Sequence, residues 1–176
     1  KKKQYNQRFW SSGNYILLSG ILEKVTHRSY ESLVKETYIK KLGLSETEFY
    51  WDIPKNKRIK VAVPYTKNSQ GYLVPHSVSV DRVRGDLGAG SLVMSNSDLY
   101  RAMSAILNGE IIKPSSVQKV YAPADPAKYN TGFYNFPDFH SSNGSGDGYT
   151  TYYRVSNSTR DVLVVQSNYP VKDYFK

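Results

Sequence analysis

Apolar residues recur with a helical period in the first part of the chain. Between Gly13 and Thr26 they fall three or four positions apart, which predicts an amphipathic helix rather than a strand. A second helix is expected to follow Ser29, which suits an N-cap, and to end before Gly43, which can adopt a left-handed turn. The apolar positions of this helix pair are Tyr15, Leu17, Leu18, Ile21, Leu22, Val25, Tyr30, Leu33, Val34, Tyr38 and Leu42.

Residues 45–87 lack a long periodic stretch and predict a connecting region. Pro54 disfavours helix at the residue before it, so Trp51–Pro54 is expected to be extended. Valines alternate in Arg58–Pro64 and in Gly71–Val80, which predicts two short strands on either side of the polar turn Lys67–Gly71.

Two further helices are indicated by their end signals. Ser95 is placed to cap a helix, with Asp98 at the position of a capping-box acid and Asn108-Gly109 at the end. Pro114 is predicted to begin a short helix that runs through Tyr121, because proline fits the first helical turn.

The last part of the chain is patterned as strands. We expect a strand over Tyr129–Phe136 and a hairpin formed by Gly148–Val155 and Asp161–Ser167. Residues Val162–Val165 are apolar on both faces, which is typical of a central, covered strand. Helices followed by strands predict an α+β fold, with an antiparallel sheet and helices on one of its faces.

Composition narrows the class of protein. The 176 residues are 39% hydrophobic and 22% charged, which predicts one globular domain or a large part of one. No apolar run approaches the length of a membrane span, and Lys1–Gln4 precedes no apolar region, so neither a transmembrane segment nor a signal peptide is expected. Cysteine is absent, and His27, His76 and His140 are scattered, so we expect no disulfide, no metal and no cofactor.

The charge balance is basic. The formal net charge is +9, and there are 16 tyrosines, a composition that suits polyanions such as nucleic acid, teichoic acid or an anionic membrane surface. The alternative is that the lysines are solvated and the tyrosines are packing residues, since the charges cluster only at the N-terminus, at Lys40-Lys41 and at Lys55–Lys60. No nucleic-acid-binding motif accompanies them, so no nucleic-acid partner is expected.

Two stretches carry a family resemblance. The helix-pair segment FWSSGNYILLSGILEKVTHRSYESLVKETYIKKLGL, Phe9–Leu44, and GAGSLVMSNSDL, Gly88–Leu99, resemble the penicillin-recognising serine hydrolases, which include class C β-lactamases, low-molecular-weight penicillin-binding proteins and related esterases. In that alignment the family's second motif, Tyr-Ser-Asn, falls on Trp10-Ser11-Ser12. The third motif, Lys-Thr-Gly or His-Thr-Gly, falls on Ser142-Asn143-Gly144, and a two-residue shift would place His140 at the basic position.

The resemblance implies a β-lactamase/DD-peptidase-like fold that lacks its N-terminal part. Residues 1–176 would be the C-terminal portion of one domain. Residues 1–50 would form the helix pair of the helical lobe, residues 51–127 loops and helices, and residues 128–176 strands of the sheet. The implied site joins Trp10 and Ser12 to the Ser142–Gly144 segment at one cleft. The other interpretation of that glycine- and serine-rich segment is a hairpin loop without a role.

The family's nucleophile, the serine of Ser-x-x-Lys, lies well upstream of the second motif, whereas only nine residues precede Trp10 here. Two such tetrads do occur, Ser32…Lys35 and Ser116…Lys119, but chance explains that number and both fall in helices that the resemblance assigns to packing. We therefore expect this chain alone to be inactive.

The resemblance implies a bacterial cell-surface or extracellular serine hydrolase that acts on D-alanyl amides or esters of peptidoglycan or teichoic acid. A non-catalytic binder of an anionic wall polymer on the same fold is the alternative, and a nucleic-acid binder is a third. Because the strand Asp161–Ser167 would normally pair with the missing part, we expect the upstream segment or another chain to cover that edge.

Overall fold

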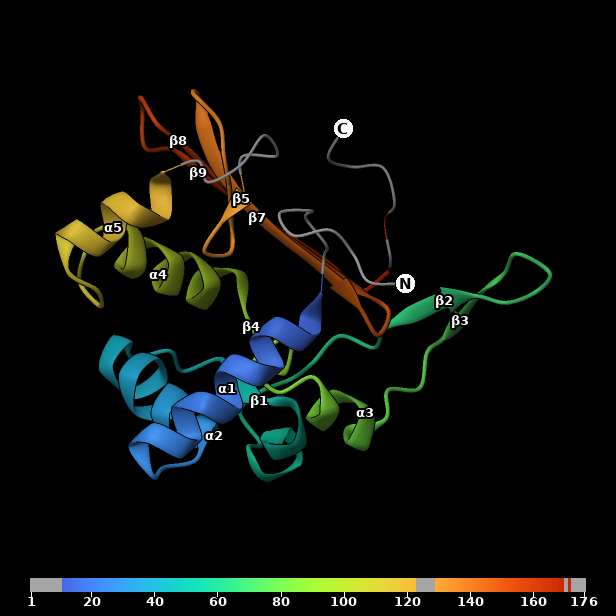
Figure 1. The fold of residues 1–176 in the computed structure, drawn as a ribbon. Helices are drawn as coiled ribbons and strands as arrows, with labels where there is room; N and C mark the ends of the chain where they lie inside the picture. The colour runs from blue at the N-terminus through green and yellow to red at the C-terminus, as the bar shows by residue number, and fades with distance from the viewer. Residues whose placement is uncertain (1–10, 123–128, 170, 172–176) are drawn as a thin grey trace, which may run out of the picture.

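The structure is a computed structural model that describes residues 11–122, 129–169 and 171. A group of helices lies to one side of a twisted sheet, and a two-stranded hairpin projects from the body (Figure 1). The elements in chain order are α1 (Ser12–Thr26), α2 (Tyr30–Val34), the π-helix η1 (Lys35–Lys40), β1 (Thr47–Phe49), the 3-10 helix η2 (Tyr50–Lys55), β2 (Tyr65–Lys67), β3 (Leu73–Pro75), α3 (Val80–Gly85), β4 (Leu92–Met94), α4 (Asn96–Leu107), α5 (Pro114–Tyr121), β5 (Tyr129–Asn130), β6 (Phe133–Asn135), β7 (Phe139–Gly146), β8 (Tyr149–Ser156) and β9 (Val162–Ser167).

The main sheet has five antiparallel strands in the order β5-β6-β7-β8-β9. Helices α4 and α5 pack on one face, where Leu107 and Val120 meet Tyr153 and Val155 of β8 in a buried cluster. The α+β class, the antiparallel sheet and the one-sided helical cover are therefore confirmed, as is the predicted β8–β9 hairpin. Strand β9, however, is not central: among the described residues it pairs only with β8, and Leu163 on it is 52% exposed.

A second core lies under the first helices. Val34, Phe49, Trp51 and Val83 are buried together, and strands β1 and β4 pair beside them. The rings of Phe49 and Trp51 are stacked with centroids 5.1 Å apart, and the guanidinium of Arg84 lies over the Trp51 ring. The helix pair is thus attached to the body through a short, non-local strand pair that sequence periodicity could not predict.

The expectation of an extended Trp51–Pro54 is wrong, because this segment forms the 3-10 helix η2 with Pro54 inside it. The preference of a residue before proline is weak compared with tertiary contacts. Here burial of Trp51 and the ion pairs of Asp52 with Lys35 and Lys55 favour the compact turn.

The two short strands predicted between residues 58 and 80 are also misplaced. The hairpin turn is where expected, but the strands are Tyr65–Lys67 and Leu73–Pro75, and Val80 begins α3. Alternating valines indicate an extended segment that contacts the body on one side, and such contact does not require a partner strand. The region 129–136 forms two strands rather than one, because Thr131 and Gly132 both have positive φ and close a tight turn.

The second helix follows Ser29 as predicted, and the Ser29 side chain accepts a hydrogen bond from the Ser32 N–H. Its middle turn is π-helical rather than α-helical, over Lys35–Lys40. Gly43 has a φ of 65°, in agreement with the predicted left-handed end. The helix at Pro114–Tyr121 agrees with its prediction at both ends.

The predicted N-cap of α4 is confirmed, but its capping box is not closed. Ser95 Oγ accepts from the Asp98 N–H, whereas the Asp98 carboxylate turns to β1. There its Oδ2 accepts from the Glu46 N–H at 2.8 Å and from Thr47 Oγ at 2.7 Å. The Ser95 N–H already donates to the Glu46 carbonyl and does not need the Asp98 carboxylate. Asp98 therefore binds the start of β1 instead.

We expect Asp98→Ala to lower the free energy of unfolding by about 3 kcal/mol, because two donors lose a buried charged acceptor. Urea unfolding measured by circular dichroism would give this value. The matched control is Asp138→Ala, an exposed aspartate, which should change stability by less than about 0.5 kcal/mol. Equal effects of the two substitutions would contradict the role assigned to Asp98.

Candidate active site

Two residues of the predicted second motif, Ser11 and Ser12, lie at the start of α1. Ser11 is the N-cap residue, with an extended backbone and no side-chain cap, and Ser12 is the first helical residue and half-buried. The Ser11 hydroxyl is therefore not used for capping, and a helix start leaves backbone N–H groups without intrahelical partners. Trp10, the third residue assigned to this motif, lies outside the described residues.

A hydrogen bond links this turn to the sheet. Tyr15 Oη lies 2.8 Å from Tyr129 Oη on β5. Tyr129 pairs with Tyr134 across β5 and β6, and Tyr134 pairs with Ser141 across β6 and β7. The start of α1 is thus joined to the cross-strand neighbours Tyr129, Tyr134 and Ser141, and Ser141 immediately precedes Ser142.

The register of β7 decides which way the predicted third motif faces. Ser142 pairs with Tyr153 and His140 pairs with Val155, and both partners belong to the helix-covered core. Because side chains alternate along a strand, Ser142 and Gly144 lie on the helical face and Asn143 lies on the opposite face. The segment is therefore a regular strand, and the side chain of Asn143 faces away from the other two motif positions.

One edge of β7 is open beside these residues. Strand β6 pairs with β7 only at His140 and Ser141, so within the described residues the β7 edge from Ser142 to Gly146 has no partner strand on that side. Alternate backbone N–H and C=O groups of such an edge can bind an extended chain or a carbonyl group. This edge is the feature of the described structure that is best suited to holding a substrate.

The turn after β7 is fixed from two directions. Gly148 has a φ of 79°, and a Cβ there would lie 2.7 Å from Pro64 Cβ. Arg82 of α3 donates from Nε to Asp147 Oδ1 at 2.7 Å, and the Tyr149 hydroxyl donates to the Ala62 carbonyl at 2.7 Å. Sequence reasoning did not identify Arg82 or Asp147, since nothing local marks two residues that meet from separate elements.

The small residues before β4 allow α1 to approach closely. A Cβ on Gly88 would lie 2.9 Å from the Ser19 side chain and the Tyr15 carbonyl. Ser19, a buried residue of α1, donates from its hydroxyl to the Leu87 carbonyl at 3.1 Å. The helix that begins at Ser12 is positioned by this contact.

His140 has the environment of a core residue. It is 8% exposed, its ring contacts Tyr121 with centroids 3.8 Å apart, and its Nδ1 donates to Asn135 Oδ1 at 2.6 Å. Burial, with a smaller effect of the Arg160 charge, lowers the pKa of His140 to about 4. His140 is therefore neutral near pH 7, and these contacts favour Ser142 over His140 as the residue at the motif's first position.

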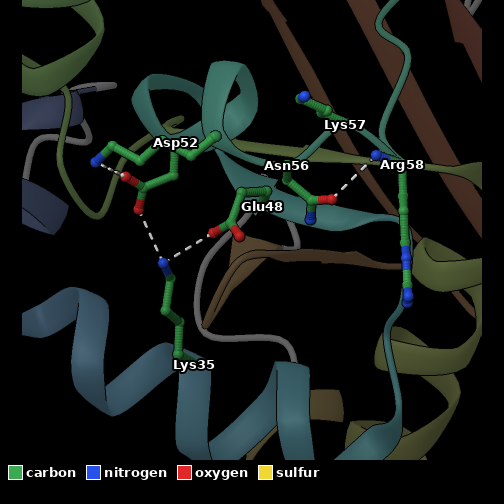
Figure 2. Close-up of a pocket in the computed structure, with 7 residues that line it drawn as sticks. Lys35, Glu48, Asp52, Asn56, Lys57 and Arg58 are labelled. Carbon is green, nitrogen blue, oxygen red and sulfur yellow. Dashed lines mark hydrogen bonds and ion pairs between the residues drawn. The ribbon is translucent and has the colours of Figure 1, made fainter.

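A polar hollow of about 560 Å³ lies beside η2 and β1 (Figure 2). Lys35 Nζ contacts Glu48 at 3.0 Å and Asp52 at 2.8 Å within it. Burial opposes the charge on Lys35, but the hydrogen bonds to Asp52 and Glu48 outweigh this effect and raise the pKa of Lys35. The lining residues are Lys35, Glu48, Asp52, Lys55, Asn56, Lys57 and Arg58.

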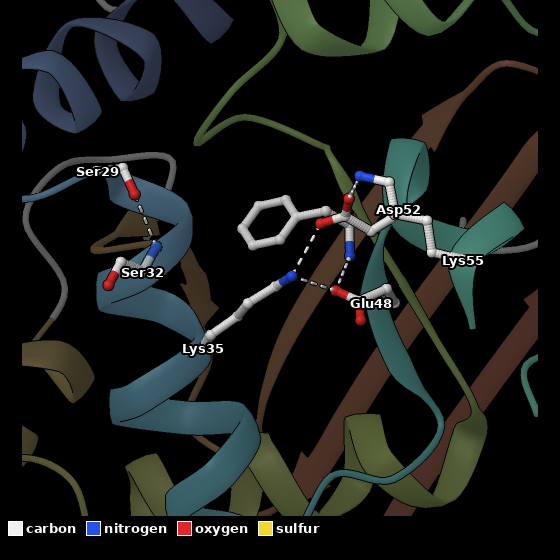
Figure 3. A network of polar contacts seen from close by, with 7 residues as sticks. Ser29, Ser32, Lys35, Glu48, Asp52 and Lys55 are labelled. Carbon is white, nitrogen blue, oxygen red and sulfur yellow. Dashed lines mark hydrogen bonds and ion pairs between the residues drawn. The ribbon is translucent and has the colours of Figure 1, made fainter.

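This network argues against Ser32…Lys35 as a nucleophile and its base. Lys35 points to the two carboxylates and away from Ser32, as Figure 3 shows. The Ser32 hydroxyl instead accepts from Arg28 at 3.1 Å. A lysine held charged by two carboxylates cannot take the serine proton, since it must be neutral to act as a base.

Metal and membrane features are limited within the described ranges. Residues 11–122, 129–169 and 171 contain no group of three or more potential ligands among His, Cys, Asp and Glu. Among the same residues, no helix is both long and apolar enough to cross a bilayer.

Comparison with known proteins places this geometry in context. The family model described as Beta-lactamase matches residues 2–175. The chain is 28% identical over 171 residues to PbpX of Bacillus subtilis (strain 168), which carries a penicillin-binding-protein name, covering 95% of this chain and 41% of that protein. It is 27% identical over 180 residues to a Staphylococcus aureus protein named teichoic acid D-alanine hydrolase, covering 97% of this chain and 43% of that protein.

Solved structures have the same fold. The crystal structure of FmtA from Staphylococcus aureus superposes with a TM-score of 0.80 at 24% identity, covering 96% of this chain and 47% of that one. The D-amino acid amidase from Ochrobactrum anthropi SV3, complexed with D-phenylalanine, gives a TM-score of 0.74 at 15% identity, covering 100% of this chain and 55% of that one. The chain spans less than half the length of the curated relatives it matches.

Gly148→Ala should lower the free energy of unfolding by about 2 kcal/mol, because alanine resists positive φ and its Cβ would collide with Pro64. Gly144→Ala is the matched control, since its φ is not positive and a Cβ there meets nothing within 4 Å. Chemical unfolding of both variants tests the turn geometry. A Gly144→Ala variant at least as destabilised as Gly148→Ala would show that the turn is not constrained as described.

The pKa of His140 predicts a pH dependence of stability. Its folded pKa is about 4, below the unfolded value of 6.5. The contribution of neutral His140 to the free energy of unfolding is therefore complete above about pH 6.5 and is lost as pH falls toward 4. Between pH 7.5 and pH 5 the loss from this group should be about 2 kcal/mol.

His140→Gln removes the titrating group, so its stability should fall less over that pH interval than that of the unmodified chain. Unfolding at a series of pH values measures the difference between the two proteins, in which the shared carboxylates cancel. Parallel pH profiles would show that His140 is solvated.

Proposed function

The chain belongs to the Beta-lactamase family, and from this premise we propose that it is the C-terminal portion of a penicillin-binding-protein-like serine hydrolase. Its proposed substrates are D-alanyl amides or esters of the bacterial cell wall, in peptidoglycan or teichoic acid. The observation that carries the proposal is the open edge of β7 from Ser142 to Gly146, next to the start of α1.

Each part of the site has a proposed role. The β7 edge would hold the acyl-D-alanyl group by backbone hydrogen bonds, and Gly144 would leave room for it, since nothing lies within 4 Å of its Cβ position. Ser142 lies on the same face and would donate a hydroxyl where the family has a cation. Ser12 and Trp10 would line the opposite wall, with the Trp10 indole replacing a tyrosine ring but not its hydroxyl.

The names of the relatives support D-alanyl chemistry. One curated relative is a teichoic acid D-alanine hydrolase, another carries a penicillin-binding-protein name, and a structural neighbour is a D-amino acid amidase. Amides and esters of D-amino acids require the same acyl transfer, in which a serine attacks and an oxyanion is stabilised. Such substrates also place the protein at the cell surface in our proposal.

A non-catalytic wall-polymer binder on the same fold is the second candidate. The Trp10 indole cannot act as a general acid or base at the position of the motif tyrosine, and Ser142 has no charge at the position of the motif cation. Backbone donors along β7 would still bind a D-alanyl group, because they do not depend on side-chain identity. The two candidates differ in whether a covalent acyl-enzyme forms.

We propose a further polypeptide segment as the partner that completes the site. The apolar residues of α1 are largely uncovered, with Leu17 and Val25 each 65% exposed. At the sheet, β9 has an unpaired edge within the described residues, and Val165 is 39% exposed. Both surfaces suit the upstream half of a β-lactamase-like domain, supplied by the same protein or by another chain, which would also supply Ser-x-x-Lys.

This chain alone should form no covalent adduct with a fluorescent penicillin, because Lys35 is held charged by Glu48 and Asp52 and the family's Ser-x-x-Lys lies upstream of the second motif. The measurement is incubation followed by a denaturing gel and intact mass. Ser32→Ala and Ser116→Ala are the matched controls for any labelling that occurs. An adduct that either substitution abolishes would overturn the dismissal of those tetrads.

Adding the upstream region, covalently or in trans, should make the protein acylable if it is a hydrolase. In that protein Trp10→Tyr should raise the acylation rate, by about tenfold or more, because a phenol can pass a proton and an indole cannot. Absence of acylation in the completed protein, together with retained binding of a D-alanyl polymer, would favour the non-catalytic binder.

A further inference from the structure

A basic strip follows η2 on the surface. We define it by Lys57, Arg58 and Lys60, all of which are exposed. Among the ion pairs of the described residues, none involves these three side chains. Their charge is therefore available to a ligand.

The neighbouring carboxylates, Glu48 and Asp52, are already ion-paired with lysines. Asp52 contacts both Lys35 and Lys55 at 2.8 Å, and Glu48 contacts Lys35 at 3.0 Å. Hydrogen bonds from Lys35 and Lys55 lower the pKa of Asp52 and keep it charged within this network. In Figure 2 no dashed contact joins the side chain of Lys57 or Arg58 to Glu48 or Asp52. The hollow is lined by four cations and two carboxylates.

Backbone contacts determine where the strip begins and where the chain runs after it. The Asn56 side chain accepts from the Arg58 N–H, and the Asn56 carbonyl accepts from the Ile59 N–H, so a turn presents the basic residues outward. Two residues after Lys60, the Ala62 carbonyl accepts from the Tyr149 hydroxyl on β8. Two residues further on, Pro64 packs at Gly148, where a Cβ would lie 2.7 Å from Pro64 Cβ, so the segment that carries the strip runs to the turn that follows the open β7 edge.

We propose that the basic strip binds the phosphate groups of an anionic polyphosphodiester, and so selects a teichoic-acid-type polymer as the substrate of the β7 site. This inference rests on the proposed function and specifies its substrate class. Peptidoglycan stem peptides offer no row of phosphates, whereas an ester-substituted phosphodiester chain can lie along the strip and present a D-alanyl group at the edge.

The residue types favour phosphate. Arginine presents a planar fork of donors that matches phosphate oxygens, and lysine adds a compact positive charge. One exposed contact is weak, but several contacts to one polymer add together and release its counterions. The strip also lacks the aromatic side chains on which the bases of single-stranded nucleic acid stack, so a polymer without bases is favoured.

The test uses Lys57→Gln, Arg58→Gln and Lys60→Gln together, which keep polar side chains on an exposed segment. The matched control is Lys24→Gln, Lys113→Gln and Lys119→Gln, three exposed cations on α1 and at α5. Each set lowers the net charge by the same amount, so net charge alone predicts equal effects. The probe is fluorescein-labelled poly(glycerol phosphate), with single-stranded DNA and an uncharged stem peptide as comparison ligands.

At about 0.1 M salt the strip variant should bind poly(glycerol phosphate) about tenfold or more weakly than the unmodified chain, and the control set by less than about threefold. The slope of log Kd against log salt should fall by about two in the strip variant. Equal losses in both sets would overturn the inference, as would tighter binding of DNA than of poly(glycerol phosphate) at the strip. Near-ultraviolet circular dichroism confirms that both variants keep the packing around Trp51.

This outcome is separable from the proposed activity. Binding is measured without turnover, whereas hydrolase activity is measured in the completed protein with a small D-alanyl ester that carries no phosphate. If the strip variant loses polymer binding and keeps turnover of the small ester, both proposals stand. If the strip variant binds the polymer as well as the unmodified chain does while the completed protein hydrolyses the ester, the phosphate-binding role of the strip is refuted and the hydrolase proposal remains.

Discussion

Eight residue pairs join β7 to β8, and the orientation of every position in the candidate site follows from that register. A slip of one residue would exchange the face of Ser142 and Gly144 with that of Asn143, and it would also turn His140 out of the core. The register is set at one end by burial of His140 and Val155, and at the other by the Asp147-Gly148 turn. The catalytic hypothesis and the polymer hypothesis both depend on this ladder, because the basic strip reaches the site through that turn.

The uncovered surfaces show what the hydrophobic pattern does and does not determine. Periodicity in α1 gave the correct helix, yet its leucines are exposed and the buried residue is Ser19, which packs at Gly88. An amphipathic pattern records that a helix has a partner, but it does not say whether that partner belongs to the same 176 residues. The same holds for β9, whose apolar residues predicted a covered strand, whereas the part of the chain that the structure describes leaves it at the sheet edge.

The sequence therefore predicted features that depend on local chemistry better than features that depend on distant contacts. The Ser95 cap, the start of α5 at Pro114 and the hairpin between β8 and β9 follow from residues within one turn of each other. The turn at Trp51 depended on the ion pair between Asp52 and Lys35, which lies seventeen positions before Asp52 in sequence, and propensity alone gave the wrong conformation. For the site, the alignment indicated Ser142–Gly144, but only the strand register separates Asn143 from its neighbours. The role of Trp10 stays a prediction.

The β2–β3 hairpin projects from the body and is held mainly at its base, where the Tyr65 N–H donates to the Asn168 carbonyl at 2.8 Å (Figure 1). Its tip is shaped by Asn68, whose side chain accepts from two backbone N–H groups, and by Gly71 at a φ of 86°. Tyr72 is 69% exposed and packs on nothing that the core requires. Evolution can therefore change the length and most of the sequence of this arm at little cost to folding. Descendants of one ancestral chain should diverge here first, while Pro64 and Gly148 beneath the arm stay fixed.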